Sequence, residues 1–303
     1  MPGSQDFAAD PRNANVLIYL NGALVPRAEA RVSVFDAGFV LGDGVWEGIR
    51  LHKGRLVFLD AHLDRLFAGA RQIRLDLGLT REAIVGAIRH TLAANGMHDG
   101  VHIRLMATRG VKAAVNQDPR NALGCATIVI VAEHKLPSPE IMSKGLCLWT
   151  SSIRCTPAEM FDMRLNSHSR LNLIRALIDV LDKGADEALM LDPHGFVSSC
   201  NATNFFFVRG GEVFTSTGAY CFNGVTRGNV IDLARANGIA LHLGDFTLAD
   251  VAQADEAFVT GTFGGLTPVN AIDGRPLPAP LPGPVTQRLG ALYAAAKDAE
   301  PLA

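Results

Sequence analysis

The chain of 303 residues is long enough for two domains of ordinary size, each with its own hydrophobic core. Hydrophobic residues make up 48% of it and charged residues 19%, which is the balance of a globular protein and not of a disordered one. A formal net charge of −2 gives nucleic acid or an anionic membrane no electrostatic reason to bind, so we expect a small soluble ligand instead.

The sequence predicts a cytoplasmic protein. Its five cysteines are scattered, odd in number and without a CxxC pair, which argues against a disulfide framework or a zinc site and fits a reducing compartment. The N-terminal stretch lacks the apolar segment of a secretory signal peptide. No apolar run approaches the ~18 residues that a membrane span needs.

The first half of the chain predicts short strands followed by helices. The Asn-Gly dipeptide at residues 21–22 lies between two apolar runs and favours a hairpin with a type I′ turn. A second strand pair is expected at residues 46–51 and 56–59, after which Asp60 is expected to cap an amphipathic helix. Another helix is predicted over residues 80–94. Two strands, VHIRLMATRG and ATIVIVAEH, close this half.

The stretch HKLPSPEIMSKG contains two prolines and no periodicity, so we place the domain boundary there, between a domain of residues 1–134 and one of 135–303. The second domain is predicted to contain a helix over residues 171–183, ended by Gly184. Its predicted strands are GLCLWTSSIR, EALMLD, FVSSCNATNFFFV, EVFT and EAFVTG. Strands and helices in two successive groups indicate an α+β fold.

Three segments have the chemistry to hold a phosphate group. Residues 223–227 precede a helix expected to start near Gly228, so backbone N–H groups and the Thr226 hydroxyl can face an anion there. The glycine-rich run at residues 260–265 offers a second turn with accessible amides. Arg65 can add a planar charged donor. Taken singly, these features are usually a plain helix start, a plain loop and a solvated arginine.

The order of these segments resembles that of the fold-type IV pyridoxal-phosphate enzymes, which include branched-chain and D-amino-acid aminotransferases, (R)-selective amine transaminases and aminodeoxychorismate lyases. The resemblance runs from about residue 18 to 270. It implies a two-domain α+β fold, a homodimer, and a cofactor phosphate held between Arg65, the Val225-Thr226 turn and Thr262. The matching stretches are YLNGALVP, RVSVFDAGFVLGDGVWEGIR, LDAHLDRLFAGARQIRL, GADEALMLDPHGFV, NATNFFFV, NGVTRGNVIDLA and TGTFGGLTPV.

Two positions depart from the family's pattern. The family's lysine, which binds the cofactor covalently, lies shortly before the long helix of the second domain, and counting back from Gly184 places Asn166 there. The family's glutamate, which holds the protonated pyridine nitrogen, corresponds to Ser199. An amide is neither nucleophilic nor basic, and a serine cannot hold the positive charge of the ring. We therefore expect pyridoxal or pyridoxamine phosphate to be bound noncovalently, or not at all.

Three further residues are candidates for the same pocket. His168, two residues from Asn166, can supply a proton-transfer group because the usual histidine pKa is near neutrality, although a lone histidine in a polar loop more often only forms hydrogen bonds. Arg170 can bind a substrate carboxylate or a second phosphate, or be a solvated arginine at a helix start. By resemblance Trp46 lines the pocket together with the turn at residues 42–44, the alternative being a plain core aromatic.

Three functions are consistent with these features. The first is a transaminase-family enzyme that acts on an amino acid and keto acid pair with a noncovalent cofactor, with His168 or another group moving the proton. The second is an enzyme that reuses the phosphate site for a different phosphorylated ligand. The third is a non-catalytic protein that binds the phosphate cofactor or assembles with a partner. An enzyme is the favoured interpretation, without ordinary lysine-dependent transamination.

Overall fold

A computed structural model describes residues 3–303, and residues 1 and 2 lie outside the described residues. The chain forms two compact units: the first contains the N-terminal residues up to Ala8, Pro137–Arg164 and Leu171–Ala296, and the second contains Ala9–Leu136, Leu165–Arg170 and Lys297–Ala303. The division expected at residue 134 assigns Leu165–Arg170 to the C-terminal half, whereas the structure groups this segment with the N-terminal half. The reason is a set of backbone contacts with residues 44–46, described below.

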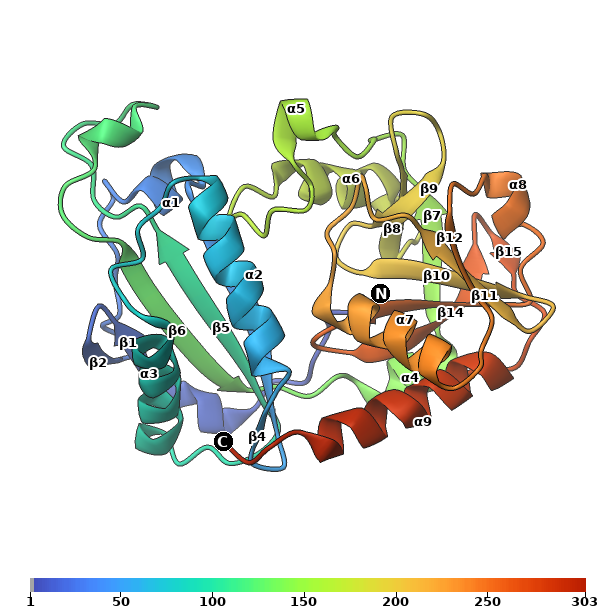
Figure 1. Ribbon diagram of the computed structural model, residues 1–303, viewed down its shortest axis with the longest axis horizontal. Helices are drawn as coiled ribbons and strands as arrows, with labels where there is room; N and C mark the ends of the chain where they lie inside the picture. Colours follow the sequence, from blue (N-terminus) through green and yellow to red (C-terminus); the bar gives the residue numbers. More distant parts are fainter. Residues whose placement is uncertain (1–2) are drawn as a thin grey trace. The chain divides into compact units, whose positions relative to one another are not determined.

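The second unit is built on a six-stranded antiparallel sheet in the order β2-β1-β6-β5-β3-β4. Burial alternates along β5, which is the pattern of a strand with one face on the core. Helices α2 (Leu59–Gln72) and α3 (Arg81–Ala94) pack against that face, and their leucines and isoleucines join the strand residues in one cluster (Figure 1). The strands are β1 (Leu17–Leu20), β2 (Ala23–Pro26), β3 (Gly44–His52), β4 (Arg55–Val57), β5 (Val101–Thr108) and β6 (Thr127–His134).

Local sequence explains where several of these elements turn and begin. The predicted hairpin is confirmed: β1 and β2 pair, and both turn residues have positive φ, 50° at Asn21 and 97° at Gly22, as a type I′ turn requires. The Thr80 side chain caps α3 by accepting from the Ala83 amide. The expectation that Asp60 caps α2 is wrong. Phe58, in the left-handed region, is the capping residue, and Asp60 lies in the first turn, where its charge favours the helix dipole.

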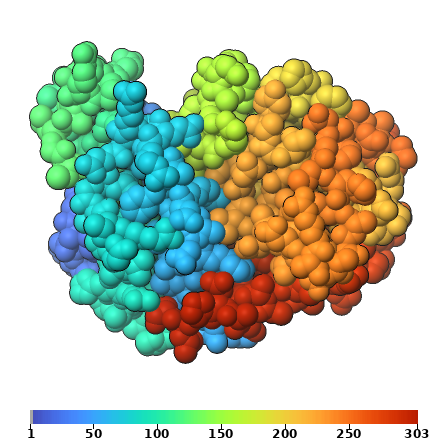
Figure 2. All heavy atoms as spheres, in the orientation of Figure 1, coloured from blue at the N-terminus to red at the C-terminus, as the bar shows by residue number. Residues whose placement is uncertain are grey.

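The short helix α1 (Ala37–Leu41) positions the start of β3. The Asp36 side chain caps it, and Gly42 ends it in the left-handed region, with a φ of 68°. Two 3₁₀ turns, η1 (Pro11–Asn15) and η2 (Pro119–Asn121), complete the unit. The connection between β5 and β6 that contains η2, green in Figure 2, projects from the surface of this unit.

The first unit is built on a nine-stranded mixed sheet in the order β12-β11-β10-β13-β14-β7-β8-β9, with β15 paired to β14. All five residues of β8 and the first five of β10 are buried, because both faces of these strands are covered. The strands are β7 (Leu146–Thr150), β8 (Glu187–Leu191), β9 (Val197–Cys200), β10 (Asn204–Arg209), β11 (Glu212–Ser216), β12 (Leu241–Gly244), β13 (Glu256–Gly261), β14 (Gly265–Ile272) and β15 (Arg275–Pro276).

Two helices of this unit bear on the candidate site. The helix predicted over residues 171–183 is α6 (Leu171–Leu181), which packs on β8. The helix expected from Gly228 is α7 (Val225–Ala236), which begins three residues earlier because Gly224 serves as its N-cap and accepts the Gly228 amide. The others are α4 (Pro139–Lys144), α5 (Ala158–Phe161), α8 (Leu248–Val251) and α9 (Pro284–Ala299). Two sheets with separate sets of helices confirm the predicted α+β class.

The remaining expectations concern membranes and cysteines. Over residues 3–303 the structure contains no helix whose length and apolar content would let it cross a bilayer. The five cysteines are free thiols, and three of them, Cys155, Cys200 and Cys221, are buried. Burial raises the pKa of Cys155 to about 12, so this thiol is inert near neutral pH.

Candidate functional site

The segment Leu165–Arg170 is fixed against the start of β3. The Trp46 amide donates to the Asn166 carbonyl over 3.0 Å, and the His168 amide donates to the Gly44 carbonyl over 3.0 Å. The Trp46 indole donates to the Ser167 carbonyl, also over 3.0 Å. A Cβ on Gly44 would come within 2.7 Å of the His168 ring, so glycine is required for this close approach. The backbone of Asn166 therefore has a defined position beside β3.

The Asn166 carboxamide is buried and hydrogen-bonded at both ends. Its Nδ2 donates to the Trp46 carbonyl and lies 3.4 Å from Oε1 of Glu47. Its Oδ1 accepts from Nη2 of Arg170. These partners fix the orientation of the amide, because the donor end faces acceptors and the acceptor end faces a guanidinium.

Glu47 is fully buried and is held by two residues of α2. Nε and Nη2 of Arg65 donate to its two oxygens over 2.8 and 2.6 Å, and Nδ1 of His62 lies 2.7 Å from Oε2. Burial acts to raise the pKa of Glu47, but the hydrogen bonds from Arg65 and His62 outweigh it and lower the pKa. Arg65, the predicted phosphate ligand, therefore already directs two of its nitrogens at a carboxylate.

Two more guanidinium groups lie around Trp46. The central carbon of Arg104 is 3.7 Å from the centroid of the indole ring, and that of Arg170 is 5.3 Å from it. Within residues 3–303, the Arg104 guanidinium forms neither a hydrogen bond nor an ion pair, although its backbone pairs with β3 and β6. Sequence reasoning missed Arg104. The signal was available, since the alternation of β5 places it on the face opposite Ile103 and Leu105.

The burial of this region and its three arginines lower the pKa values of His168 and Arg170. Burial lowers the pKa of His168 to about 4, with Arg104 and Arg170 adding to the effect. Burial, Arg104 and Arg65 lower the pKa of Arg170 to about 10. Nε2 of His168 is buried and meets no hydrogen-bond partner in the described part of the chain. The imidazole is thus neutral at pH 7 and a weaker base than the unperturbed histidine assumed from the sequence.

The two predicted phosphate turns belong to the first unit and meet at Tyr293. Thr226 is buried in the first turn of α7, with its hydroxyl 3.3 Å from the Tyr293 hydroxyl. Thr262 is half-buried in the turn between β13 and β14. A Cβ on Gly265, which ends that turn, would lie 3.5 Å from the Tyr293 ring. No side chain caps α7, so its first N–H groups are available to an anion.

Ser199 connects to the same helix through Asn204, which sequence reasoning did not single out. Nδ2 of Asn204 donates to the Ser199 hydroxyl over 3.2 Å, and its Oδ1 accepts from the Gly224 amide over 3.1 Å. The Ser199 hydroxyl donates to the Thr203 carbonyl over 2.7 Å. Thr260 pairs with Asn204 across β10 and β13, and its buried hydroxyl lacks a partner among residues 3–303. An unsatisfied hydroxyl near an uncapped helix start fits a phosphate group.

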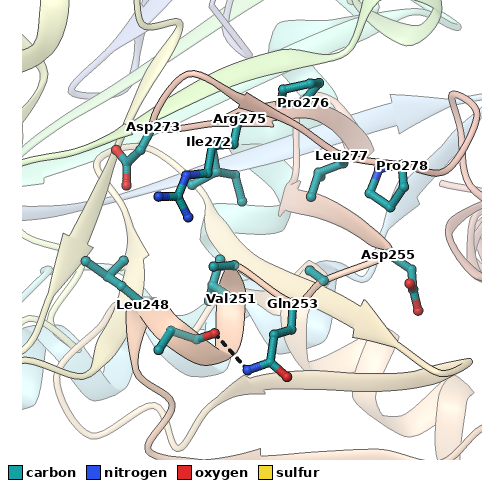
Figure 3. A pocket seen from close by; sticks show the side chains of 13 residues that line it. Leu248, Val251, Gln253, Asp255, Ile272, Asp273, Arg275, Pro276, Leu277 and Pro278 are labelled. Carbon is teal, nitrogen blue, oxygen red and sulfur yellow. Dashed lines mark hydrogen bonds between the residues drawn. The ribbon is translucent and has the colours of Figure 1, made fainter.

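The first unit also contains a cavity (Figure 3). It has a volume of about 550 Å³ and is lined by α8, β15 and the adjoining loops. Three of its polar side chains are engaged within the protein: Asp273 accepts from Thr150, Gln253 donates to the Ala249 carbonyl, and Asp255 accepts from the Gly210 amide. None of the predicted site residues lines this cavity, so it is not the candidate site.

The chain is similar to known proteins over most of its length. The family model described as class IV amino-transferase matches residues 44–272. A branched-chain-amino-acid aminotransferase-like protein 2 of Arabidopsis thaliana is 40% identical over 93% of this chain, which spans about half of that relative's length. A putative branched-chain-amino-acid aminotransferase of Methanocaldococcus jannaschii is 38% identical, covering 90% of this chain and 93% of the relative.

A solved structure agrees with this assignment. The T.th. branched-chain amino acid aminotransferase with pyridoxamine 5′-phosphate is 32% identical, with a TM-score of 0.86 and coverage of 95% of this chain and 96% of that chain. The resemblance and the fold class expected from the sequence are thereby confirmed. With a family match across residues 44–272 and relatives above 30% identity along nine tenths of its length, the chain belongs to the class IV aminotransferases and has their fold-type IV architecture.

Proposed function

We propose that this protein binds pyridoxal or pyridoxamine phosphate noncovalently and acts on an amino acid and keto acid pair without a lysine attached to the cofactor. The support for this proposal is the buried, doubly hydrogen-bonded amide of Asn166, the residue that the count back from Gly184 assigns to the family's lysine position. Four of the lysines are engaged elsewhere. Lys53 pairs with Asp298, Lys112 with the Asp118 carbonyl, Lys144 with Glu140, and Lys183 lies over Trp149.

The residues of the first unit suit a phosphorylated pyridine ligand. The first N–H groups of α7, with Thr226 and Thr262, are the proposed phosphate ligands, and the resemblance adds Arg65 from the second unit. Ser199 is the proposed partner of the ring nitrogen. Since the Ser199 hydroxyl donates to the Thr203 carbonyl, it can only accept from a ring N–H and brings no negative charge. When bound, the cofactor supplies an electron-withdrawing ring, which Ser199 would strengthen less than a glutamate does.

The residues of the second unit suit an acidic substrate. Arg104 and Arg170 supply charged donors for a carboxylate, and both guanidinium groups lie close to the Trp46 ring. His168, held by its backbone at Gly44, offers a neutral imidazole with an unsatisfied Nε2 as the proposed proton carrier. Related structures support the ligand classes: the T.th. enzyme has been solved with pyridoxamine 5′-phosphate, with N-(5′-phosphopyridoxyl)-L-glutamate and with 4-methylvaleric acid.

A second candidate function is noncovalent cofactor binding without turnover. The low pKa of His168 favours it, since an imidazole with a pKa of about 4 accepts protons poorly at pH 7. Use of the phosphate turns for a different phosphorylated ligand remains the third alternative. By resemblance the proposal also includes a homodimer, and the scattered free cysteines suit a cytoplasmic location.

Titration with pyridoxal phosphate tests the proposal. We expect saturable binding by absorbance and calorimetry, followed by complete release of the cofactor on denaturation after borohydride treatment. Pyridoxamine phosphate bound to the protein should be consumed slowly by a keto acid, and His168→Ala should abolish this reaction. Binding without any consumption would select the non-catalytic function. A covalent adduct at any lysine after borohydride would refute the noncovalent proposal, and absence of binding would leave the third alternative.

A further inference from the structure

Glu187, the first residue of β8, is a buried carboxyl group whose hydrogen-bond partners are neutral. The Ser4 hydroxyl donates to its Oε1, and the Thr203 hydroxyl donates to its Oε2 over 2.6 Å. Among residues 3–303 no lysine, arginine or histidine forms an ion pair with it. Burying a carboxylate without a positive partner costs free energy, so such groups in folded proteins are often kept for a function. The position of Thr203 indicates what that function is.

Thr203 connects Glu187 to Ser199. Its hydroxyl is bound to Glu187, while its carbonyl accepts from the Ser199 hydroxyl over 2.7 Å and from the Cys200 amide over 2.9 Å. Both ends of Thr203 are thus held, one by the carboxyl group and one by the end of β9. Because the two ends belong to one residue, the hydrogen bond at the hydroxyl helps to fix the place of the carbonyl.

The Thr203 carbonyl determines what the Ser199 hydroxyl can do. A serine hydroxyl has one proton, and here that proton is directed at the Thr203 carbonyl. Nδ2 of Asn204 donates to the Ser199 oxygen over 3.2 Å, so one lone pair is engaged as well. What remains is a second lone pair, which can accept from an N–H group but cannot donate to a bare nitrogen. If the carbonyl moved away, the hydroxyl would be released to donate instead.

Glu187 changes its charge close to neutral pH. Burial raises its pKa to about 7, against the hydrogen bond from Thr203, and the neighbouring Asp186 carboxylate adds to the rise. Cys200, the other titratable group beside it, stays a neutral thiol, because burial and the charge of Glu187 raise its pKa. The ionised form of Glu187 accepts from both hydroxyls, whereas the protonated form carries a proton that one of them must accept. The hydrogen bond at Thr203 therefore weakens or reverses as Glu187 is protonated.

We propose that Glu187 is a positioning residue for Ser199, which it holds through Thr203 as an acceptor for the ring N–H of the cofactor. This inference rests on the proposed function, because the ring nitrogen is the expected partner of Ser199. The hydrogen-bond chain from Glu187 to Ser199 consists of protein groups alone and can be measured without a ligand. Failure of this chain and failure of the cofactor assignment are therefore distinguishable.

NMR of the full-length protein without added cofactor tests the hydrogen-bond chain. The Asn204 side-chain amide reports on Ser199, since it donates to that hydroxyl. We expect its proton and nitrogen resonances to shift with a midpoint near pH 7 in the wild type, as Glu187 ionises. This step should vanish in Glu187→Gln and lose most of its size in Thr203→Val, but persist in Thr203→Ser, which keeps the hydroxyl. Glu256→Gln, at a second buried glutamate of the same unit, is the matched control and should keep the step.

Nitrogen NMR of ring-labelled pyridoxamine phosphate bound to the protein tests the acceptor role. In Thr203→Val the released Ser199 hydroxyl donates to the unprotonated ring nitrogen, so the affinity of that nitrogen for its proton should fall about 10-fold, the size of one hydrogen bond. The wild type and Thr203→Ser should agree with each other. Thermal unfolding confirms that each variant is folded at the temperature of the measurement.

An Asn204 resonance that does not titrate in the wild type would overturn the inference, and so would a step that keeps its full size in both Glu187→Gln and Thr203→Val. A ring nitrogen that binds its proton equally in the wild type and in Thr203→Val would also overturn it, while leaving the proposed function intact. If pyridoxamine phosphate does not bind at all, the proposed function fails together with the acceptor role, whatever Asn204 shows.

Discussion

Nη2 of Arg170 donates a hydrogen bond to Oδ1 of Asn166, four residues earlier in the same segment. Under the proposed function, this pairing places a guanidinium beside the position that corresponds to the family's lysine. On that proposal the region keeps a positive charge but has no nucleophilic amine. Because Asn166 also donates to the Trp46 carbonyl, its amide links Arg170 to the start of β3.

Restoring a lysine should restore covalent attachment. In Asn166→Lys the new amine would be buried near Arg170, Arg65 and Arg104, so desolvation and these like charges would lower its pKa, whereas the Glu47 carboxylate, 3.4 Å from the present amide nitrogen, would act to raise it. A deprotonated amine is the reactive form, and the variant should turn yellow with pyridoxal phosphate and be trapped by borohydride, with a stronger signal when combined with Ser199→Glu. Absorbance and peptide mass measure this. Asn166→Gln, which adds length but no amine, is the control, and an Asn166→Lys protein that remains colourless would contradict the placement of this residue.

Removal of the Glu47 charge should destabilise the second unit strongly. In Glu47→Gln, the negative charge would be lost and one of the two oxygens that accept from Arg65 would become an NH2 group, while His62 would lose its carboxylate partner, leaving a buried guanidinium poorly compensated. Breaking a buried ion pair typically costs about 3–5 kcal/mol, and urea unfolding would report this loss. Glu212→Gln removes an exposed carboxylate paired with His242 and should cost less than about 1 kcal/mol. Equal losses in the two variants would show that the Glu47 pair is not structurally important.

The elements of the second unit followed well from local sequence. The Asn21-Gly22 turn, the Thr80 cap and the alternation of β5 each depend on neighbouring residues, so pattern and structure agree. The first residues of the helices were predicted less accurately. Gly224 has no side chain that could cap a helix, so the start of α7 at Val225 could not be predicted from the sequence. Phe58 is the N-cap of α2 in a left-handed conformation, which a phenylalanine side chain gives no reason to expect.

The arrangement of the candidate site depends on contacts between residues that come together only in the folded chain, so it could not be predicted from the sequence. The family pattern predicts Asn166 and Ser199 as site residues, but their partners, Arg170 and Asn204, are defined by hydrogen bonds that form only after folding. Arg104 lies far from Asn166 in the chain, and only the pairing of β5 with β3 brings it over Trp46. The low pKa of His168 has the same origin, because burial and distant arginines cause it.

The hydroxyl of Thr226 should contribute to phosphate binding. Thr226→Ala keeps the helix but removes a donor at its uncapped N-terminus, so the affinity for inorganic phosphate and for pyridoxal phosphate should fall about 10-fold each, in line with a lost hydrogen bond to a charged group. Calorimetry measures both affinities. Thr247→Ala, which removes the threonine that caps α8 in the same unit, should leave them unchanged. An undiminished affinity in Thr226→Ala would place the phosphate elsewhere.

The burial of His168 predicts a specific dependence of stability on pH. Its folded pKa of about 4 lies below the ordinary value of 6.5, so the unfolded chain binds a proton that the folded chain excludes between these two values. Stability should be fully present above pH 6.5 and should fall as the pH decreases toward 4, by up to about 1.4 kcal/mol per pH unit from this residue. Urea unfolding of His168→Gln should show a shallower slope over that window, whereas His90→Gln, at an exposed histidine of α3, should not change it. Because Arg104 contributes to the effect, Arg104→Gln should raise the pKa of His168, as measured by NMR of its ring. An unaltered slope in His168→Gln, or an unaltered pKa in Arg104→Gln, would show that this imidazole is not enclosed beside the arginines.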